Sequence, residues 1–129
     1  MYKPKIQIRR NYELELEIPE LPKTINQLLY THWAVKNSHA KTWKTLILYA
    51  TVGKRPLEPL TKARLTLTRC SAKEPDFDGL VSSFKHVVDA LIFSKIIIDD
   101  STKHVGIPTY VWEKAKPKEG KIRIKVEEL

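Results

Sequence analysis

The sequence is poor in cysteine, with Cys70 as the single residue of this type among 129. One cysteine cannot form an internal disulfide, and it excludes structural zinc sites that are built on pairs of cysteines. The four histidines do not replace them, because none stands four residues from another, as the ligands of a helical zinc motif do. The sequence therefore disfavours both disulfide and zinc chemistry.

Long apolar runs and glycine-rich loops are also missing. No stretch approaches the roughly 20 apolar residues that cross a bilayer. The basic start, Met1 to Lys5, is not followed by the apolar core of a secretory signal. We therefore expect no membrane span and a cytoplasmic protein. Only 4 glycines are present, and no Gly-rich phosphate loop is among them, which disfavours a nucleotide phosphohydrolase.

Positive charge is what the sequence has in excess. Lys and Arg number 23 against 15 for Asp and Glu, so the formal net charge is +8. On a chain of this length, which has room for one domain over residues 1–129, such an excess creates a field that attracts polyanions. Nucleic acid is the expected partner, and charge that serves only solubility is the alternative. An anionic membrane would require a basic amphipathic helix, which we do not find.

The periodicity of the first half predicts one strand and one helix. Residues 13–18 alternate Glu with Leu or Ile, which is typical of a strand with one buried face. From Pro22 to Asn37 we expect a loop with a short helix. Ser38 is the expected N-cap of a helix that continues to about Val52, and Gly53 is its expected stop.

The second half predicts a strand, a helix and two further β segments. The strand runs from Ala63 to Cys70, and the helix from about Gly79 to Phe93. Val105–Ala115 and Lys121–Glu127 follow, which we interpret as a terminal hairpin. The expected fold class is α/β or α+β, a small single-domain mixed β-sheet with two main helices.

Acidic residues gather near the start of the predicted second helix. In an extended chain, side chains two residues apart point the same way with their Cα atoms roughly 6.5–7 Å apart, so Asp76 and Asp78 can converge on one ion. Carboxylate oxygens suit Mg²⁺, which supports phosphodiester hydrolysis. Asp99 or Asp100, after an apolar run, is the candidate third ligand, and periodicity does not choose between them.

Lys85 and the aspartates also have plain structural interpretations. On the helix, Lys85 is expected near the side of Asp78, where its ammonium could meet a phosphate oxygen or a leaving group. Alternatively, Asp78 caps the helix, Lys85 and Asp89 form a surface salt bridge at i, i+4, and Asp99-Asp100 is an ordinary turn.

The joint order of these residues resembles the RusA family of Holliday-junction resolvases. The resemblance consists of Asp76-x-Asp78, then Lys85 four residues before Asp89-Ala90-Leu91, then Asp99-Asp100. It covers about residues 75–105 well. It covers the terminal β segments loosely, and the N-terminal half only through the first strand and residues 22–26.

The resemblance implies a structure-specific, metal-dependent endodeoxyribonuclease. Asp76, Asp78 and Asp100 would be the metal-binding catalytic carboxylates, with Asp99 as the alternative third ligand, and Lys85 would be the catalytic lysine. Mg²⁺ is the implied cofactor, with Mn²⁺ as a substitute. The implied partners are branched DNA, cut symmetrically at a four-way junction, and a second copy of the chain, since a two-fold dimer suits a two-fold substrate.

The sequence departs from the family at two positions. The best-known members have Asn directly after the second Asp and the lysine four residues beyond that Asp. Here Gly79 follows, and Lys85 comes seven residues after Asp78. Three extra residues are nearly one helical turn, about 4.5 Å along the axis. Either Lys85 lies on the same side of the helix one turn further along its axis, or the loop before the helix is longer.

Contacts to DNA phosphates are expected from basic residues close to the motif or on the first helix. Such contacts make affinity strongly dependent on salt. The alternative function is a non-catalytic basic DNA-binding module, although carboxylates in a DNA-facing cleft repel phosphate unless a cation is present. The candidate contacts are Lys36, Lys41, Lys44, Arg69 and Lys73.

Overall fold

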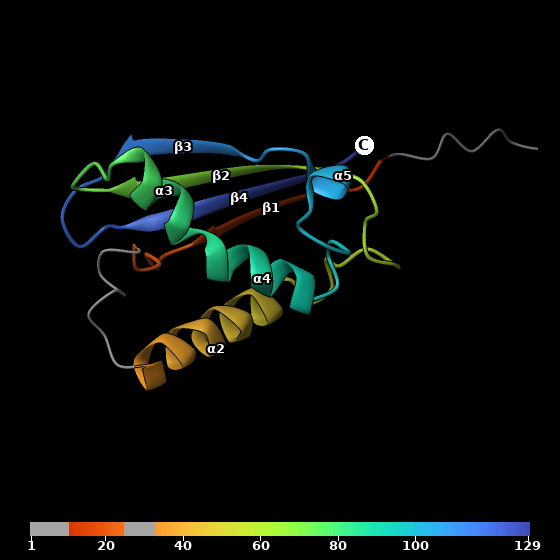
Figure 1. The fold of residues 1–129 in the computed structure, drawn as a ribbon, viewed down its shortest axis with the longest axis horizontal. Helices are drawn as coiled ribbons and strands as arrows, with labels where there is room; N and C mark the ends of the chain where they lie inside the picture. Colours follow the sequence, from red (N-terminus) through yellow and green to blue (C-terminus); the bar gives the residue numbers. More distant parts are fainter. Residues whose placement is uncertain (1–10, 25–32) are drawn as a thin grey trace, which may run out of the picture.

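The computed structural model describes residues 11–24 and 33–129, and its centre is a four-stranded mixed sheet (Figure 1). The strand order is β1-β4-β2-β3. β1 pairs antiparallel with β4, β4 antiparallel with β2, and β2 parallel with β3. This confirms the expected α+β class. The strands are β1 (Glu13–Ile18), β2 (Ala63–Ser71), β3 (Thr109–Lys114) and β4 (Lys121–Glu128).

Alternating side chains give the sheet one apolar face. In β1, Leu14, Leu16 and Ile18 are buried and the glutamates between them are exposed, as the alternation predicted. Leu16 and Leu67 lie on either side of Ile124 of β4, so three strands bury their aliphatic side chains on the same face. The helices pack on this face (Figure 1).

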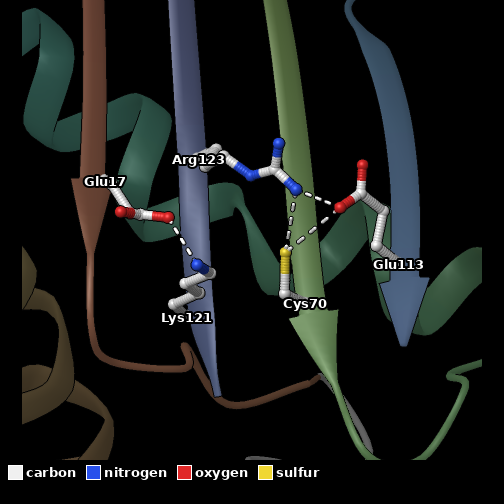
Figure 2. Close-up of polar contacts among 5 residues, drawn as sticks. All are labelled: Glu17, Cys70, Glu113, Lys121 and Arg123. Atoms are coloured by element: carbon white, nitrogen blue, oxygen red, sulfur yellow. Dashed lines mark hydrogen bonds and ion pairs between the residues drawn. The ribbon is translucent and has the colours of Figure 1, made fainter. Parts of the chain in front are cut away.

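The opposite face of the sheet carries charged side chains in pairs (Figure 2). Lys121 lies 2.6 Å from a carboxylate oxygen of Glu17, and this hydrogen bond lowers the pKa of Glu17. Arg123 pairs with Glu113 across β2, and its Nη2 atom also lies 3.5 Å from Sγ of the buried Cys70. These pairs are open to solvent, so they contribute little to stability.

The predicted terminal hairpin is wrong, because β2 lies between β3 and β4. Both terminal strands exist, but β3 pairs parallel with β2 from Thr109 to Lys114 and β4 pairs with the other edge of β2. The end of β2 is buried from Leu67 to Ser71, and a strand that is buried on both faces gains most from neighbours on both edges. Val105, expected at the start of a β segment, lies instead in the single-turn helix α5 (Thr102–Val105).

The first helix begins earlier than predicted. α2 spans Trp33–Ala50, so Ser38 lies inside it and is not its N-cap. The carbonyl of Ser38 accepts a hydrogen bond from the Thr42 hydroxyl. Burial of Trp43 and Ile47 against the core stabilises the whole helix, and such packing outweighs the preference of a serine for a cap. Gly53, at a φ of 75°, lies just beyond the end of the helix, as expected.

The predicted second helix is divided in two at Phe84. α3 spans Phe77–Ser83 and α4 spans Lys85–Phe93, and Phe84 between them has φ −89° and ψ 0°. Ser83 and Ser82 donate their hydroxyl hydrogens to carbonyls one turn earlier, which bends helices. The break places the fully buried Phe84 ring beside Tyr110 of β3, at a centroid distance of 6.1 Å.

α2 and α4 pack against each other beneath the sheet (Figure 1). His39 of α2 is at this contact, and its Nε2 atom accepts hydrogen bonds from the Lys23 amide and from Nε1 of Trp43. The His86 ring of α4 lies 5.0 Å away. Burial lowers the pKa of both histidines. For His39, the positive charges of His86 and Lys23 lower the pKa further.

Within residues 11–24 and 33–129, none of the helices has the length and apolar character needed to cross a membrane.

The apolar run before Asp99 contains two buried residues, Ile96 and Ile97, and one exposed residue, Ile98. Ile97 forms an isolated parallel bridge with Leu60. The run is therefore a buried connection with a single bridge.

Phe84→Ala should lower the free energy of unfolding by about 3–5 kcal/mol, because it leaves a cavity at the junction of two helices and the sheet. Denaturant unfolding measures the change. Phe93→Ala is the matched control, since the Phe93 side chain is 54% exposed and its loss should cost less than about 1 kcal/mol. Equal losses for the two variants would contradict the packing described here.

The histidine pair should make stability depend on pH. Both folded-state pKa values lie below the ordinary 6.5, so the unfolded chain binds more protons than the native protein. Stability is therefore complete above the ordinary value and falls as the pH decreases below it toward the folded-state values. Denaturant unfolding between about pH 7.5 and about pH 5.5 should show this decrease, and His86→Asn should reduce it. A flat wild-type profile over this range would contradict the account.

Candidate functional site

The motif residues lie at the starts of α3 and α4 and in the loop after the buried isoleucines. Asp76 is the N-cap of α3, with extended backbone angles, and its Oδ1 atom accepts a hydrogen bond of 2.8 Å from the Gly79 amide. Asp78, which sequence reasoning offered as the cap, lies in the first turn instead. Its exposed carboxylate makes no hydrogen bond or ion pair with the residues described in the structure.

The close approach of Gly79 to Asp76 explains why glycine suits this position. A Cβ atom at position 79 would lie 2.5 Å from Oδ1 of Asp76. Any larger residue would require the Asp76 carboxylate to shift. Glycine therefore fits the geometry that this chain adopts at its Asp-x-Asp sequence.

The break at Phe84 determines where Lys85 lies relative to Asp78. The chain forms a separate seven-residue helix, α3, and begins α4 at Lys85 itself. The extra residues between Asp78 and Lys85 are therefore taken up by a bend between two helices. Neither of the two expected arrangements, one continuous helix or a longer loop before it, describes this solution.

Lys85 lies between two carboxylates. Its Nζ atom is 3.3 Å from Oδ1 of Asp89 and 3.9 Å from Oδ2 of Asp100. The expected i, i+4 ion pair with Asp89 is confirmed. All three side chains are partly open to solvent, with exposed fractions of 65% for Lys85, 36% for Asp89 and 41% for Asp100, so these pairs contribute little to stability.

Of the two adjacent aspartates, Asp100 is the one beside Lys85. Asp99 turns back instead, and its Oδ1 atom accepts a hydrogen bond of 2.8 Å from the Asp100 amide. This hydrogen bond lowers the pKa of Asp99. The geometry therefore places the Asp100 carboxylate, and not that of Asp99, within ion-pair distance of Lys85.

Tyr110 is a neighbour of the site that sequence reasoning missed. Burial raises the pKa of its phenol, and the nearby charge of Asp100 adds to this effect. Its ring also contacts Phe84 at the break between the helices. The sequence carried no signal for this proximity, because it depends on β3 lying parallel to β2 at the edge of the sheet.

The carboxylates are not assembled as a closed metal site in this structure. In the part of the chain that is described, no three His, Cys, Asp or Glu side chains are grouped so that they could hold a metal ion. The structure brings Lys85, Asp89 and Asp100 together. Asp76 and Asp78 stand at the start of α3, outside this group.

The candidate DNA-binding residues fall in two regions. Lys36, Lys41 and Lys44 are all on α2, where the Nζ atom of Lys44 lies 5.3 Å from the ring centroid of Phe93 on α4. Lys73 is exposed in the loop after β2. Arg69, in contrast, is buried with only 6% of its surface exposed, and its Nη1 atom donates a hydrogen bond to the Pro22 carbonyl.

Comparison with known proteins does not add a family. No protein-family model matches the chain, and no curated protein matches it either.

Removing the cap should separate the structural role of Asp76 from its charge. Asp76→Ala should lower the free energy of unfolding by about 1 kcal/mol, whereas Asp76→Asn should leave it nearly unchanged, because asparagine caps as well as aspartate does. Thermal or denaturant unfolding measures both. Glu74→Ala is the control, as this exposed side chain has no partner among the described residues. An equal loss for Asn and Ala at position 76 would argue against the cap.

Proposed function

We propose that this chain is a magnesium-dependent, structure-specific endodeoxyribonuclease that cleaves four-way DNA junctions, as RusA-family resolvases do. The observation that carries the proposal is the proximity of Lys85 to Asp100, 3.9 Å apart although they come from separate segments of the motif. A lysine held beside a carboxylate, next to a helix that begins with two further aspartates, has the parts that phosphodiester hydrolysis needs.

The donor chemistry of the site fits a hard cation. Asp76, Asp78 and Asp100 offer exposed carboxylate oxygens, the ligands that Mg²⁺ and Mn²⁺ take from proteins. In the proposal these three residues hold the ion. When bound, the ion would neutralise charge on the scissile phosphate and make a water molecule more acidic. Because the three carboxylates are not grouped in the structure, ion binding must include a movement that brings them closer.

Lys85 is the proposed donor to the phosphate. Its side chain is 65% exposed, so the ammonium can reach a ligand, and Asp89 and Asp100 limit where it lies. An ammonium at this place stabilises negative charge on a phosphate oxygen or on the leaving oxygen. The two aspartates are therefore positioning residues for Lys85, and Asp100 is also a proposed ligand.

Affinity for the DNA is proposed to come from the positive charge of the chain. The net charge is +8, and three of the candidate lysines are on α2, which packs against α4. Phosphate contacts by such residues release counterions, so binding should weaken steeply with salt. A homodimer would present two such sites to the two opposing strands of a junction.

A non-catalytic DNA-binding module is the second candidate. Two observations favour it: Asp76 already serves as a helix cap, and the described residues contain no group of three metal donors. In this alternative the aspartates are structural and surface residues, and the positive charge alone provides the function.

Cleavage of a synthetic four-way junction, compared with a linear duplex of the same sequence, tests the proposal. We expect paired, symmetric nicks in the junction with Mg²⁺ or Mn²⁺ and none with EDTA. Asp78→Asn and Lys85→Met should each reduce the rate by about a hundredfold or more, the usual loss for a group that stabilises transition-state charge.

Glu58→Gln and Lys62→Met are the matched controls, because both side chains are exposed and neither belongs to the motif. They should cleave at the wild-type rate. Full activity of Asp78→Asn would contradict the proposed site. Tight binding of the junction without nicks under either metal ion would favour the binding module.

A further inference from the structure

A pocket of about 490 Å³ opens beside Asp76, between the segment that follows β1 and the loop that follows β2. Leu21 and Thr24 line it from the first segment, and Lys73 lines it from the loop. Arg69 lines it from the end of β2, and Asp76 from the N-cap of α3. Its position at the end of the central strand places it next to the start of α3, where the Asp-x-Asp sequence lies.

Arg69 is the unusual residue in this pocket, because it is a buried cation without a counter-charge in the part of the chain that the structure describes. Its exposed fraction is 6%, and its Nη1 atom donates a hydrogen bond of 2.6 Å to the Pro22 carbonyl. No carboxylate among the described residues lies within ion-pair distance of it. Burial lowers the pKa of Arg69, yet an arginine remains charged at neutral pH.

Arg69 brings unused donors to the lining of the pocket. A guanidinium carries five N–H groups, and the Pro22 carbonyl accepts from only one nitrogen. Nε and Nη2 have no hydrogen-bond partner among the described residues, and Arg69 is one of the residues that line the pocket. A buried charge with open donors is costly unless an anion compensates it.

The other polar groups of the wall define what can enter. Lys73 adds a second positive charge from the exposed loop. The Ser71 hydroxyl is already occupied, since it donates to the Lys73 carbonyl and accepts from Nε1 of Trp112. Glu74 and Asp76 also line the pocket, but Oδ1 of Asp76 is engaged with the Gly79 amide and Glu74 is exposed.

We propose that this pocket binds a backbone phosphate of the nucleic acid, with Arg69 as a bidentate donor at its floor and Lys73 at its rim. Planar guanidinium groups match the geometry of phosphate oxygens, which is why arginine is the usual partner of a buried phosphate. The identity of the ligand rests on the proposed function. In that setting the pocket fixes the strand beside Asp76 and so aligns a neighbouring phosphodiester with Lys85.

Binding in the absence of metal tests the pocket separately from catalysis. With EDTA present, a short oligothymidylate and inorganic phosphate are titrated in parallel, and the Arg69 Nε–H and Lys73 amide signals are followed by NMR at constant ionic strength. The oligothymidylate should shift both signals and bind more tightly than inorganic phosphate. Arg69→Gln should weaken its binding by about tenfold or more, and Lys73→Met by about threefold, in line with buried and exposed charged contacts.

Lys62→Met, at the opposite end of β2, is the control and should bind like the wild type. Equal weakening by Lys62→Met and Lys73→Met would overturn the proposal, since it would mean that charge acts only non-specifically. Binding of inorganic phosphate without the oligothymidylate would also overturn it and identify a free-anion site. If Arg69→Gln does not fold, the comparison of Lys73→Met with Lys62→Met decides.

Failure of this proposal and failure of the proposed function give different results. Asp78→Asn should keep the pocket's affinity while it loses cleavage. If Lys73→Met cleaves the junction normally and binds oligothymidylate like the wild type, the proposed phosphate pocket is contradicted. The proposed nuclease activity is not.

Discussion

Burial of the central strand β2 is the constraint on which the rest of the molecule depends. It is paired on both edges, antiparallel with β4 and parallel with β3, and its last five residues are all buried. This arrangement sets β3 beside β2, which brings Tyr110 to Phe84 and Asp100. It also fixes where the chain leaves the sheet, so that Arg69, Lys73 and Asp76 gather around one pocket.

The bend at Phe84 determines which side chains of the motif lie together. The Phe84 ring enters the core beside Tyr110, and the chain breaks there: α3, which contains Asp78, ends at Ser83, and α4 starts at Lys85. Lys85 thereby faces Asp100 as well as Asp89. The sequence departures from the RusA pattern, Gly79 and the three extra residues before Lys85, are both consistent with this local solution.

Local patterns in the sequence predicted the elements better than their arrangement. The alternation in residues 13–18 was enough for β1, and the stop at Gly53 was correct, because both depend on neighbouring residues. The hairpin failed because pairing with β2 is a contact between distant parts of the chain, and Ser38 failed as a cap because the packing of α2 overrode it. Likewise, periodicity could not separate Asp99 from Asp100, whereas the hydrogen bond between them and the position of Lys85 favour Asp100.

In the proposed function, carboxylates from the start of α3 and from the loop at Asp100 share one divalent ion. Paramagnetic broadening of the amide NMR signals by substoichiometric Mn²⁺ tests it most directly. The account predicts that the signals of Asp78 and Asp100 broaden together, and that Asp78→Asn abolishes both effects. Broadening that is spread over unrelated exposed carboxylates, such as Glu13 and Glu15 of β1, would contradict it.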